Sequence, residues 1–369
     1  MNRRRWPWLA LALVLLALGI VAMRLTEDKP PPPRPRPVRF AAANSDEAMR
    51  RRLARTTYVP PAAHDAGTEP SKPVDPFLEA LPRGENHTAV VIEANAVRHS
   101  PLGELLLECL LMQPQAREQL EAFRQHTGVD PLEGVDRVAV MDDGLVISGQ
   151  FGQARMESLL PGEWRASEHG DKGRVYAPAK PPTPSQGDLA AVGTWGDSML
   201  VIGRTPEEVH GILERIEGRG SSEPPVLGGQ YAYGDVYGVV SVERLADSLP
   251  PEQRALGERL KQLAPRARLN LDVSSDFALS VGLKGPDAER TADMAKAIGA
   301  AMALARFEAQ SQGQTELARV LEYAGTSAMN DHLGVQLAVP LEVLRQELSW
   351  CRGASISGST DAGTPAPAR

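Results

Sequence analysis

The stretch RVAVMDDGLVISGQF, Arg137–Phe151, holds two short apolar runs on either side of an Asp-Asp-Gly turn. Asp-Gly pairs favour tight hairpin turns, because glycine adopts a positive φ without steric cost. Short apolar runs bounded by polar residues are typical of buried strands. The stretch therefore predicts an antiparallel hairpin that turns at Asp142-Asp143-Gly144.

The same kind of pattern recurs along the chain. Apolar runs at 189–194 and 199–203 bracket a second turn, and residues 326–339 hold a third hairpin. In the runs 269–273 and 277–284, leucine and valine alternate with other residues. Such alternation indicates antiparallel strands with one buried and one solvated face.

Helical periodicity appears between these strands. The clearest case begins with the capping box Thr205-Pro206-Glu207-Glu208 and ends at Gly218. A second helix begins at Ser100-Pro101, where serine is a favoured N-cap and proline suits the first helical position. We expect it to bury the apolar residues Leu102, Leu105, Leu106, Cys109 and Leu110.

Both halves of the chain run strand, helix, hairpin, helix, hairpin, helix. This order predicts an α+β protein of two lobes, each an antiparallel sheet with helices on one face. A diverged duplication is a hypothesis that this pattern suggests. The predicted divisions are a first lobe at 85–218, a Gly- and Pro-rich linker at 219–232, a second lobe at 233–352 and a disordered tail at 353–369.

The amino terminus has the composition of a membrane anchor. Arg3-Arg4-Arg5 precedes Trp6–Met23, a run of 18 uncharged residues. As a helix it would be about 27 Å long, close to the hydrocarbon thickness of a bilayer. We predict a cytoplasmic stub and single transmembrane helix at 1–25. A cleaved signal peptide is the alternative, although the run is longer than a typical signal core.

Residues 26–84 have the composition of a tether. Lys29 is followed by a Pro- and Arg-rich run to Pro37, which favours an extended polyproline helix. Four arginines between Asp46 and Tyr58 suggest a short basic helix near lipid headgroups, and the rest reads as largely disordered.

Charge patterning suggests the location. The three arginines before the apolar run favour a cytoplasmic N-terminus. We therefore expect a single-pass protein of the bacterial inner membrane with its bulk in the periplasm. The chain carries a net charge of −7, residues 1–60 contribute +8, and the remainder therefore carries −15. Such an acidic globular part predicts no nucleic-acid partner.

The sequence contains no motif that names a catalytic, cofactor-binding or metal-binding residue. It lacks a phosphate-binding glycine loop, a nucleophile elbow and the common zinc spacings. Asp142-Asp143 as a cation site and His99-Ser100 as a nucleophile pair are weaker interpretations than a hairpin turn and a helix cap. The histidines are scattered and are expected at the surface: His64, His87, His99, His126, His169, His210 and His332.

Three other features leave alternatives open. Cys109 and Cys351 are the two cysteines; Cys109 is expected to be a buried hydrophobic residue, with a disulfide between them as the alternative. Asn86 begins a glycosylation sequon, which carries little weight in a bacterial chain. Tryptophans near predicted loop tips, Trp164, Trp195 and Trp350, are candidate anchors for a partner.

The phrase HTGVDPLEGVDRV, His126–Val138, leads directly into the first hairpin. With this phrase and its element order, the chain resembles a diffuse group of uncharacterised anchored or exported bacterial proteins over residues 88–340. Its composition is similar to that of myxobacterial proteins. The resemblance implies no activity and no functional residues.

These observations predict a non-catalytic, membrane-tethered envelope protein that acts in protein interaction or scaffolding. Its expected partners are the lipid bilayer and an envelope protein. The alternative is a ligand-binding or enzymatic protein with its site in the cleft between the two lobes.

Overall fold

The computed structural model describes residues 38, 40–42, 45–55, 57–58, 73–160, 163–179, 191–219, 221, 223–248 and 254–348. These residues form an α+β fold around one antiparallel sheet of 12 strands. The strands are β1 (Ala89–Ile92), β2 (Val135–Met141), β3 (Leu145–Gly149), β4 (Trp164–His169), β5 (Gly173–Pro178), β6 (Ala191–Trp195), β7 (Met199–Gly203), β8 (Val236–Ser241), β9 (Arg266–Asp272), β10 (Phe277–Lys284), β11 (Ala324–Met329) and β12 (His332–Val339).

The predicted helices follow in the order that the sequence indicates, and α3, α4 and α9 are additions. They are α2 (Asp46–Ala54), α3 (Pro76–Glu79), α4 (Ala94–Arg98), α5 (Pro101–Leu111), α6 (Pro114–Thr127), α7 (Met156–Leu159), α8 (Pro206–Ile216), α9 (Val242–Ser248), α10 (Arg254–Leu263), α11 (Ala288–Ser311), α12 (Thr315–Glu322) and α13 (Leu341–Glu347).

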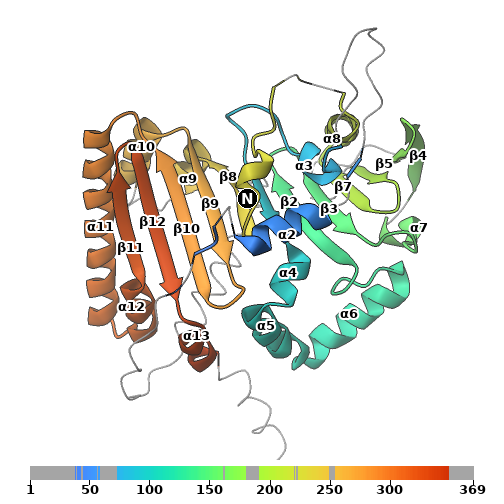
Figure 1. Ribbon diagram of the computed structural model, residues 1–369. Helices are drawn as coiled ribbons and strands as arrows, with labels where there is room; N and C mark the ends of the chain where they lie inside the picture. The colour runs from blue at the N-terminus through green and yellow to red at the C-terminus, as the bar shows by residue number, and fades with distance from the viewer. Residues whose placement is uncertain are drawn as a thin grey trace, which may run out of the picture.

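The two halves of the sheet follow matching paths. The strand order is β11-β12-β10-β9-β8-β1-β2-β3-β7-β6-β5-β4. Outward from the centre, the first half runs β1-β2-β3-β7-β6 and the second runs β8-β9-β10-β12-β11; the first half then continues with β5 and β4, which have no counterpart in the second. Strands β1 and β8 pair antiparallel at the junction, with Val91 opposite Tyr237. Figure 1 shows the second-half strands side by side, with α11 along the outer edge.

One face of the sheet is apolar and covered in the first half. Helix α8 places Val209, Ile212, Leu213 and Ile216 on it, all with 0% exposure. They pack in one cluster with Val91, Val146 and Val201 of the sheet, and with Phe77 of α3. The N-cap half of the predicted capping box forms at the start of α8, since Thr205 accepts a hydrogen bond from the Glu208 amide at 3.2 Å. The Glu208 carboxylate accepts from the Arg204 amide at 2.7 Å, one residue before the N-cap.

The opposite face is covered in the second half. Leu283 and Leu333 of β10 and β12 pack in one cluster with Leu260 of α10 and Met294 of α11. A second cluster on this face joins Phe277 to residues of α5 and α13. Helices thus cover the two halves differently, and the described sheet is continuous across both. The structure differs here from the prediction of separate sheets with helices on one face each, because β1 and β8 pair with each other.

Part of the segment expected to be a disordered tether belongs to the fold. Helices α2 and α3 lie within it, and the backbones of Tyr58 and Val74 form an antiparallel bridge. Phe77 and Leu81 are fully buried, so this segment contributes to the first core. Order therefore begins earlier than residue 85, because these apolar side chains cover the sheet beside α8.

Helix α5 buries less than its periodicity predicts. Leu102 and Leu105 are buried, whereas Leu106 and Leu110 are 42% and 39% exposed. Cys109 is half-buried and is disulfide-bonded, which is the alternative to the predicted buried thiol. Cys351 lies outside the described residues, as do the predicted anchor and tail. Within the described part of the chain, none of the helices is both long and apolar enough for a bilayer crossing.

Candidate binding site

The covered face of the first half becomes polar where it passes from β8 to β9. Tyr237 and Val239 of β8 are buried, and their register partners on β9 are Asn270 and Arg268. Paired residues of adjacent strands share a face of the sheet. From β9 outward, the same face carries polar and small side chains. We call these residues the open face: Arg268, Asn270, Ser280, Gly282, Gly334, Gln336, Gly325 and Ser327.

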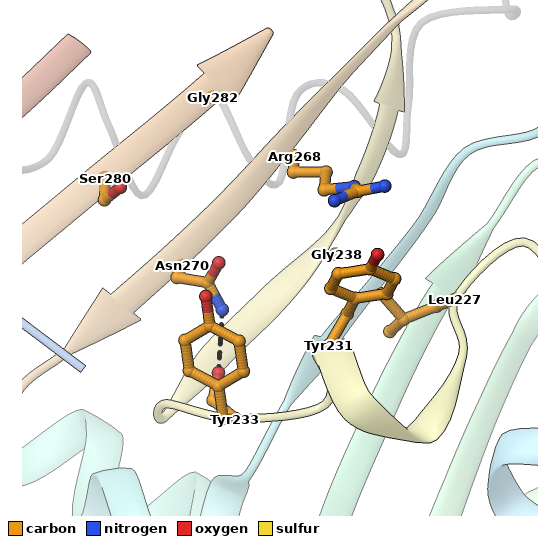
Figure 2. A pocket seen from close by; sticks show the side chains of 8 residues that line it. All are labelled: Leu227, Tyr231, Tyr233, Gly238, Arg268, Asn270, Ser280 and Gly282. Carbon is orange, nitrogen blue, oxygen red and sulfur yellow. Dashed lines mark hydrogen bonds between the residues drawn. The ribbon is translucent and has the colours of Figure 1, made fainter. Parts of the chain in front are cut away.

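A pocket lies at the inner border of the open face. It has a volume of about 170 Å³ and is lined by Leu227, Tyr231, Tyr233, Gly238, Arg268, Asn270, Ser280 and Gly282. Figure 2 shows the two tyrosine rings and the Arg268 side chain around one opening. The Arg268 guanidinium lies 3.9 Å from the centroid of the Tyr231 ring, which is a cation–π contact. Asn270 donates a hydrogen bond to the Tyr233 carbonyl at 2.8 Å.

Helix α2 holds the loop that carries both tyrosines. Arg51 donates to the Gly234 carbonyl at 3.0 Å, and Arg55 donates to the Ala232 carbonyl at 3.3 Å. With the bond from Asn270, three consecutive carbonyls of the loop have side-chain donors. Such contacts fix the loop before any ligand arrives, which lowers the ordering cost of binding. The predicted basic helix therefore forms, and these two arginines contact the protein.

A buried ionic cluster of Arg55, Asp75, Glu93, Arg137 and Tyr237 lies behind this loop. Arg55 contacts Glu93 at 3.1 Å, and the Tyr237 hydroxyl donates to the same carboxylate at 2.7 Å. Arg137 binds Asp75 through both amino groups, at 2.7 and 3.1 Å. Burial, and then the Glu93 charge, raise the pKa of Tyr237 well above its usual value, so the phenol stays protonated. The cluster joins α2, α3, β1, β2 and β8.

Asp235 stands at the same junction with 1% exposure of its side chain. It lies 2.7 Å from Arg51 and accepts a hydrogen bond from the Val273 amide at 2.6 Å. Burial nevertheless raises the pKa of its carboxyl above the ordinary value, since desolvation outweighs these contacts. Asp235 is therefore a structural link between the loop and the end of β9.

The arrangement suits binding better than catalysis. Arg268 is exposed, and within the described part of the chain it forms no ion pair. The Ser280 side chain lines the pocket beside it without a histidine or carboxylate base among the lining residues. Nucleophilic and general-base chemistry both need such a partner within hydrogen-bond reach. The pocket therefore offers a cation, hydroxyl and amide groups, and aromatic surface.

The Asp142-Asp143 turn forms as predicted, but its carboxylates are ion-paired. Asp142 lies 2.5 Å from Arg244, and accepts a hydrogen bond from the Thr88 amide at 2.8 Å. Asp143 accepts one from Arg215 at 2.7 Å. The turn is thus not a freely solvated hairpin, because both carboxylates are engaged by arginines. In the described part of the chain, no group of three or more His, Cys, Asp or Glu residues is arranged to hold a metal ion.

Ser100 acts as a helix cap. Its hydroxyl accepts a hydrogen bond from the Gly103 amide at 3.0 Å and donates to the Val97 carbonyl at 2.7 Å. His99 is exposed and contacts the Asn95 carbonyl at 2.8 Å. The two residues do not form a nucleophile pair.

Sequence reasoning missed a histidine pair. The Nδ1 atoms of His169 and His210 lie 2.8 Å apart, although the residues are far apart in sequence. Glu217, buried at the end of α8, lies 3.8 Å from the other side of His169 and contacts Arg219 closely. Burial lowers the pKa of His169, and the nearby His210 lowers it further against the opposing effect of Glu217. No spacing rule signals this pair, because the β4–β5 hairpin and α8 bring it together.

The remaining candidates are distributed over the fold. Asn86 is exposed, and Trp164 is half-buried in β4. Trp195 is 5% exposed and packs edge-on against Tyr58 at 5.0 Å, so it is a core residue and not a surface anchor. His64 and Trp350 lie outside the described residues. The sequence signal for the pocket is the Tyr-Ala-Tyr-Gly run at residues 231–234, two aromatic residues at the end of a Gly- and Pro-rich linker.

Comparisons of the chain with protein-family models, with curated proteins and with solved structures find no match.

Proposed function

We propose that this chain is a membrane-tethered, non-catalytic envelope protein that acts in protein interaction or scaffolding. In this proposal residues 1–25 cross the bacterial inner membrane once, from a cytoplasmic N-terminus, and the bulk is periplasmic. The uncharged run Trp6–Met23 after three arginines supports the anchor and its orientation. The disulfide at Cys109 supports an oxidising compartment, since cytosolic thiols are kept reduced.

The tether of this proposal is shorter than the composition suggests. Helix α2 begins at Asp46 and is bound to the fold through Arg51 and Arg55. The spacer is then the Pro-rich segment that ends near residue 37, at about 3.1 Å per residue if extended. A diverged duplication of two lobes is supported by the matching strand orders on either side of β1 and β8.

The open face is the observation that carries a binding role. In the first half, apolar packing under α8 covers this face of the sheet. In the second half Gln336 and Ser327 are exposed on strands whose opposite face is a hydrophobic core. An accessible polar face on a rigid sheet offers a fixed array of donors and acceptors, which suits recognition of a partner.

Topology and turnover test this proposal. A periplasm-active phosphatase fused to the C-terminus should be active, and a cytoplasm-fluorescing protein fused there should stay dark. The full-length protein in mild detergent should show no turnover with ester, peptide and phosphate substrates. Fluorescence without phosphatase activity would contradict the location, and robust turnover that survives further purification would contradict the non-catalytic assignment.

A small-ligand binding protein is the second candidate function, because the structure contains the pocket at Tyr231 and Arg268. All its lining residues come from the predicted linker and second lobe, between Leu227 and Gly282. The ligand site of this candidate is thus on the second half of the sheet and not in a cleft between lobes.

A further inference from the structure

We propose that the pocket binds one carboxylate-bearing sugar unit of an acidic polysaccharide, with neighbouring units lying along the open face. This inference rests on the second candidate function, and it names the ligand class of that site. The pocket holds about 170 Å³. Sites for whole drug-sized ligands or cofactors usually span about 300–1,000 Å³. The pocket therefore suits a single ring-sized unit.

Arg268 supplies the charge that selects an acidic unit. The other basic residues near this face have carboxylate partners: Arg266 lies 3.3 Å from Glu85, and Lys284 lies 3.8 Å from Asp331. Arg268 instead rests on the Tyr231 ring and is exposed. Stacking on an aromatic ring orients the planar guanidinium, whose edge then presents two parallel donors to a carboxylate.

The strands beneath the pocket favour a saccharide over an extended peptide. Strand β9 pairs with β8 on one side and β10 on the other, and β10 pairs in turn with β12. Their backbone groups are engaged in the sheet, so a peptide cannot join them as an added strand. Only side chains are available for recognition. The Ser280 hydroxyl and the Asn270 side-chain oxygen suit sugar hydroxyls, and the Tyr233 ring adds apolar surface for a sugar ring.

Small residues extend the site beyond the pocket. Gly282 of β10 is the register partner of Gly334, which in turn pairs with Ser327 of the edge strand β11. A Cβ atom added at Gly282 or at Gly325 would meet no atom within 4 Å. Among the described residues, no side chain therefore lies over Gly282 or Gly325. The Ser327 hydroxyl, by contrast, lies beside Gly334, where an added Cβ would meet it at 2.8 Å. A polymer chain can continue across the open face without displacing any side chain at Gly282 or Gly325.

A matched pair of valine variants tests the pocket. Gly282→Val places a branched side chain in the pocket, on a strand where valine is favourable. Ala328→Val places the same side chain at an exposed position of β11 on the opposite face, where it pairs with Leu333. Arg268→Gln removes the charge while keeping hydrogen-bonding atoms.

The test is calorimetric titration of full-length protein in mild detergent with a disaccharide of galacturonic acid. The titration is repeated with the neutral galactose disaccharide, a glutamate dipeptide and inorganic phosphate. We expect binding of the uronate disaccharide only, with at least a tenfold loss of affinity in Arg268→Gln and Gly282→Val. Ala328→Val should bind within twofold of the unchanged protein, and no variant should have a lower melting temperature.

Each other outcome overturns the inference. Equal binding of the neutral disaccharide would remove the carboxylate role of Arg268. Preference for the glutamate dipeptide or for phosphate would identify a different ligand class, and absence of binding by the folded protein would remove the site. If Arg268→Gln alone failed to fold, Gly282→Val and Ala328→Val would still decide. None of these results affects the topology test. The ligand proposal can therefore fail while the envelope-protein proposal stands, and the reverse.

Discussion

The same face of one sheet is buried in the first half of the molecule and open in the second. Strands β1, β2, β3, β7 and β6 present alanine, valine and methionine to α8. The strands that match them in the other half present arginine, asparagine, serine and glycine. After β7 the chain crosses this face as α8, whereas after β12 it forms α13, which packs in the cluster of the opposite face.

The difference shows that strand order and face coverage are separate properties of this fold. Backbone pairing needs only complementary strand edges, whereas coverage depends on which alternating positions are apolar. Two halves whose strands follow the same order can therefore present different side chains on the same face of the sheet. The first half gains a core on this face, and in the second half side chains such as Gln336 and Ser327 are exposed on it.

The largest expected effect is on the covered face. Ile212→Ala in α8 removes a side chain with no exposure from the first core. We expect a loss of about 3–5 kcal/mol in the free energy of unfolding, because the cavity cannot close easily. Gln336→Ala, an exposed position on the open face, should change it by less than about 0.5 kcal/mol. Urea unfolding measures both, and equal effects would contradict the contrast between the faces.

The junction of the two halves comes next. Arg55→Gln removes the cation that Glu93 and Asp75 share. We expect the free energy of unfolding to fall by about 2–4 kcal/mol, slightly less than when one partner of a fully buried ion pair is removed. Arg50→Gln is the matched control, since Arg50 is exposed in α2, which ends just before Arg55, and among the described residues it bonds to the Asp46 carbonyl of its own helix. Arg50→Gln should lower the free energy of unfolding by less than about 0.5 kcal/mol. Thermal unfolding distinguishes the two variants. A small change in the melting temperature of Arg55→Gln would mean that these ion pairs do not hold α2 on the fold.

The histidine pair predicts a smaller, pH-dependent effect in the first half. The pKa of His169 is lowered in the folded state, so the unfolded chain takes up this proton at the higher pH. Stability should therefore fall as pH drops below about 6.5, the ordinary histidine value. We expect the free energy of unfolding to fall by less than about 1 kcal/mol between pH 8 and pH 5, because solvent screens the charges at this site.

Melting temperatures measured across this range for His169→Gln should show a flatter profile than those of the unchanged protein. His126→Gln, at an exposed position, should leave the profile unchanged. An identical pH profile for His169→Gln would show that the pair with His210 has no part in the acid sensitivity.

The smallest effect is expected on the open face itself. Gly282→Val replaces a strand glycine at a site with free space, so it should leave the protein equally stable or more stable by about 0.5–1 kcal/mol. Gly193→Val, on the covered face, places a side chain against Val209 of α8 and should be destabilising. Differential scanning calorimetry compares the two, and similar losses would show that the open face is packed.

Much of the local structure could be predicted from the sequence. The hairpin at Asp142-Asp143-Gly144, the capped helix after Thr205 and the second-half strands have strong local signals, and the structure confirms them. Helix α9 was not predicted, because its residues follow β8 without a cap signal or a break. The inward face of α5 was only half right, because periodicity identifies an apolar stripe but not how much of it finds a partner.

Most of the candidate site could not be predicted from the sequence. A polar alternation on β9 and β10 indicated a solvated face, but not that Tyr231 would lie over Arg268 from a different part of the chain. Asp75 and Glu93 each look like ordinary surface acids in sequence, and only the approach of Arg55 and Arg137 buries them.

By itself, the sequence determined the elements of this protein: its antiparallel strands, its capped helices and their repeated order. These follow from turn chemistry and from the period of apolar residues, which act between near neighbours. Tertiary structure alone decided that β1 and β8 join both halves into one sheet, and that α8 covers one half of a face while the other stays open. Those outcomes depend on contacts between residues more than 100 positions apart, such as Val91 with Tyr237, whose strength comes from burial that no local pattern encodes.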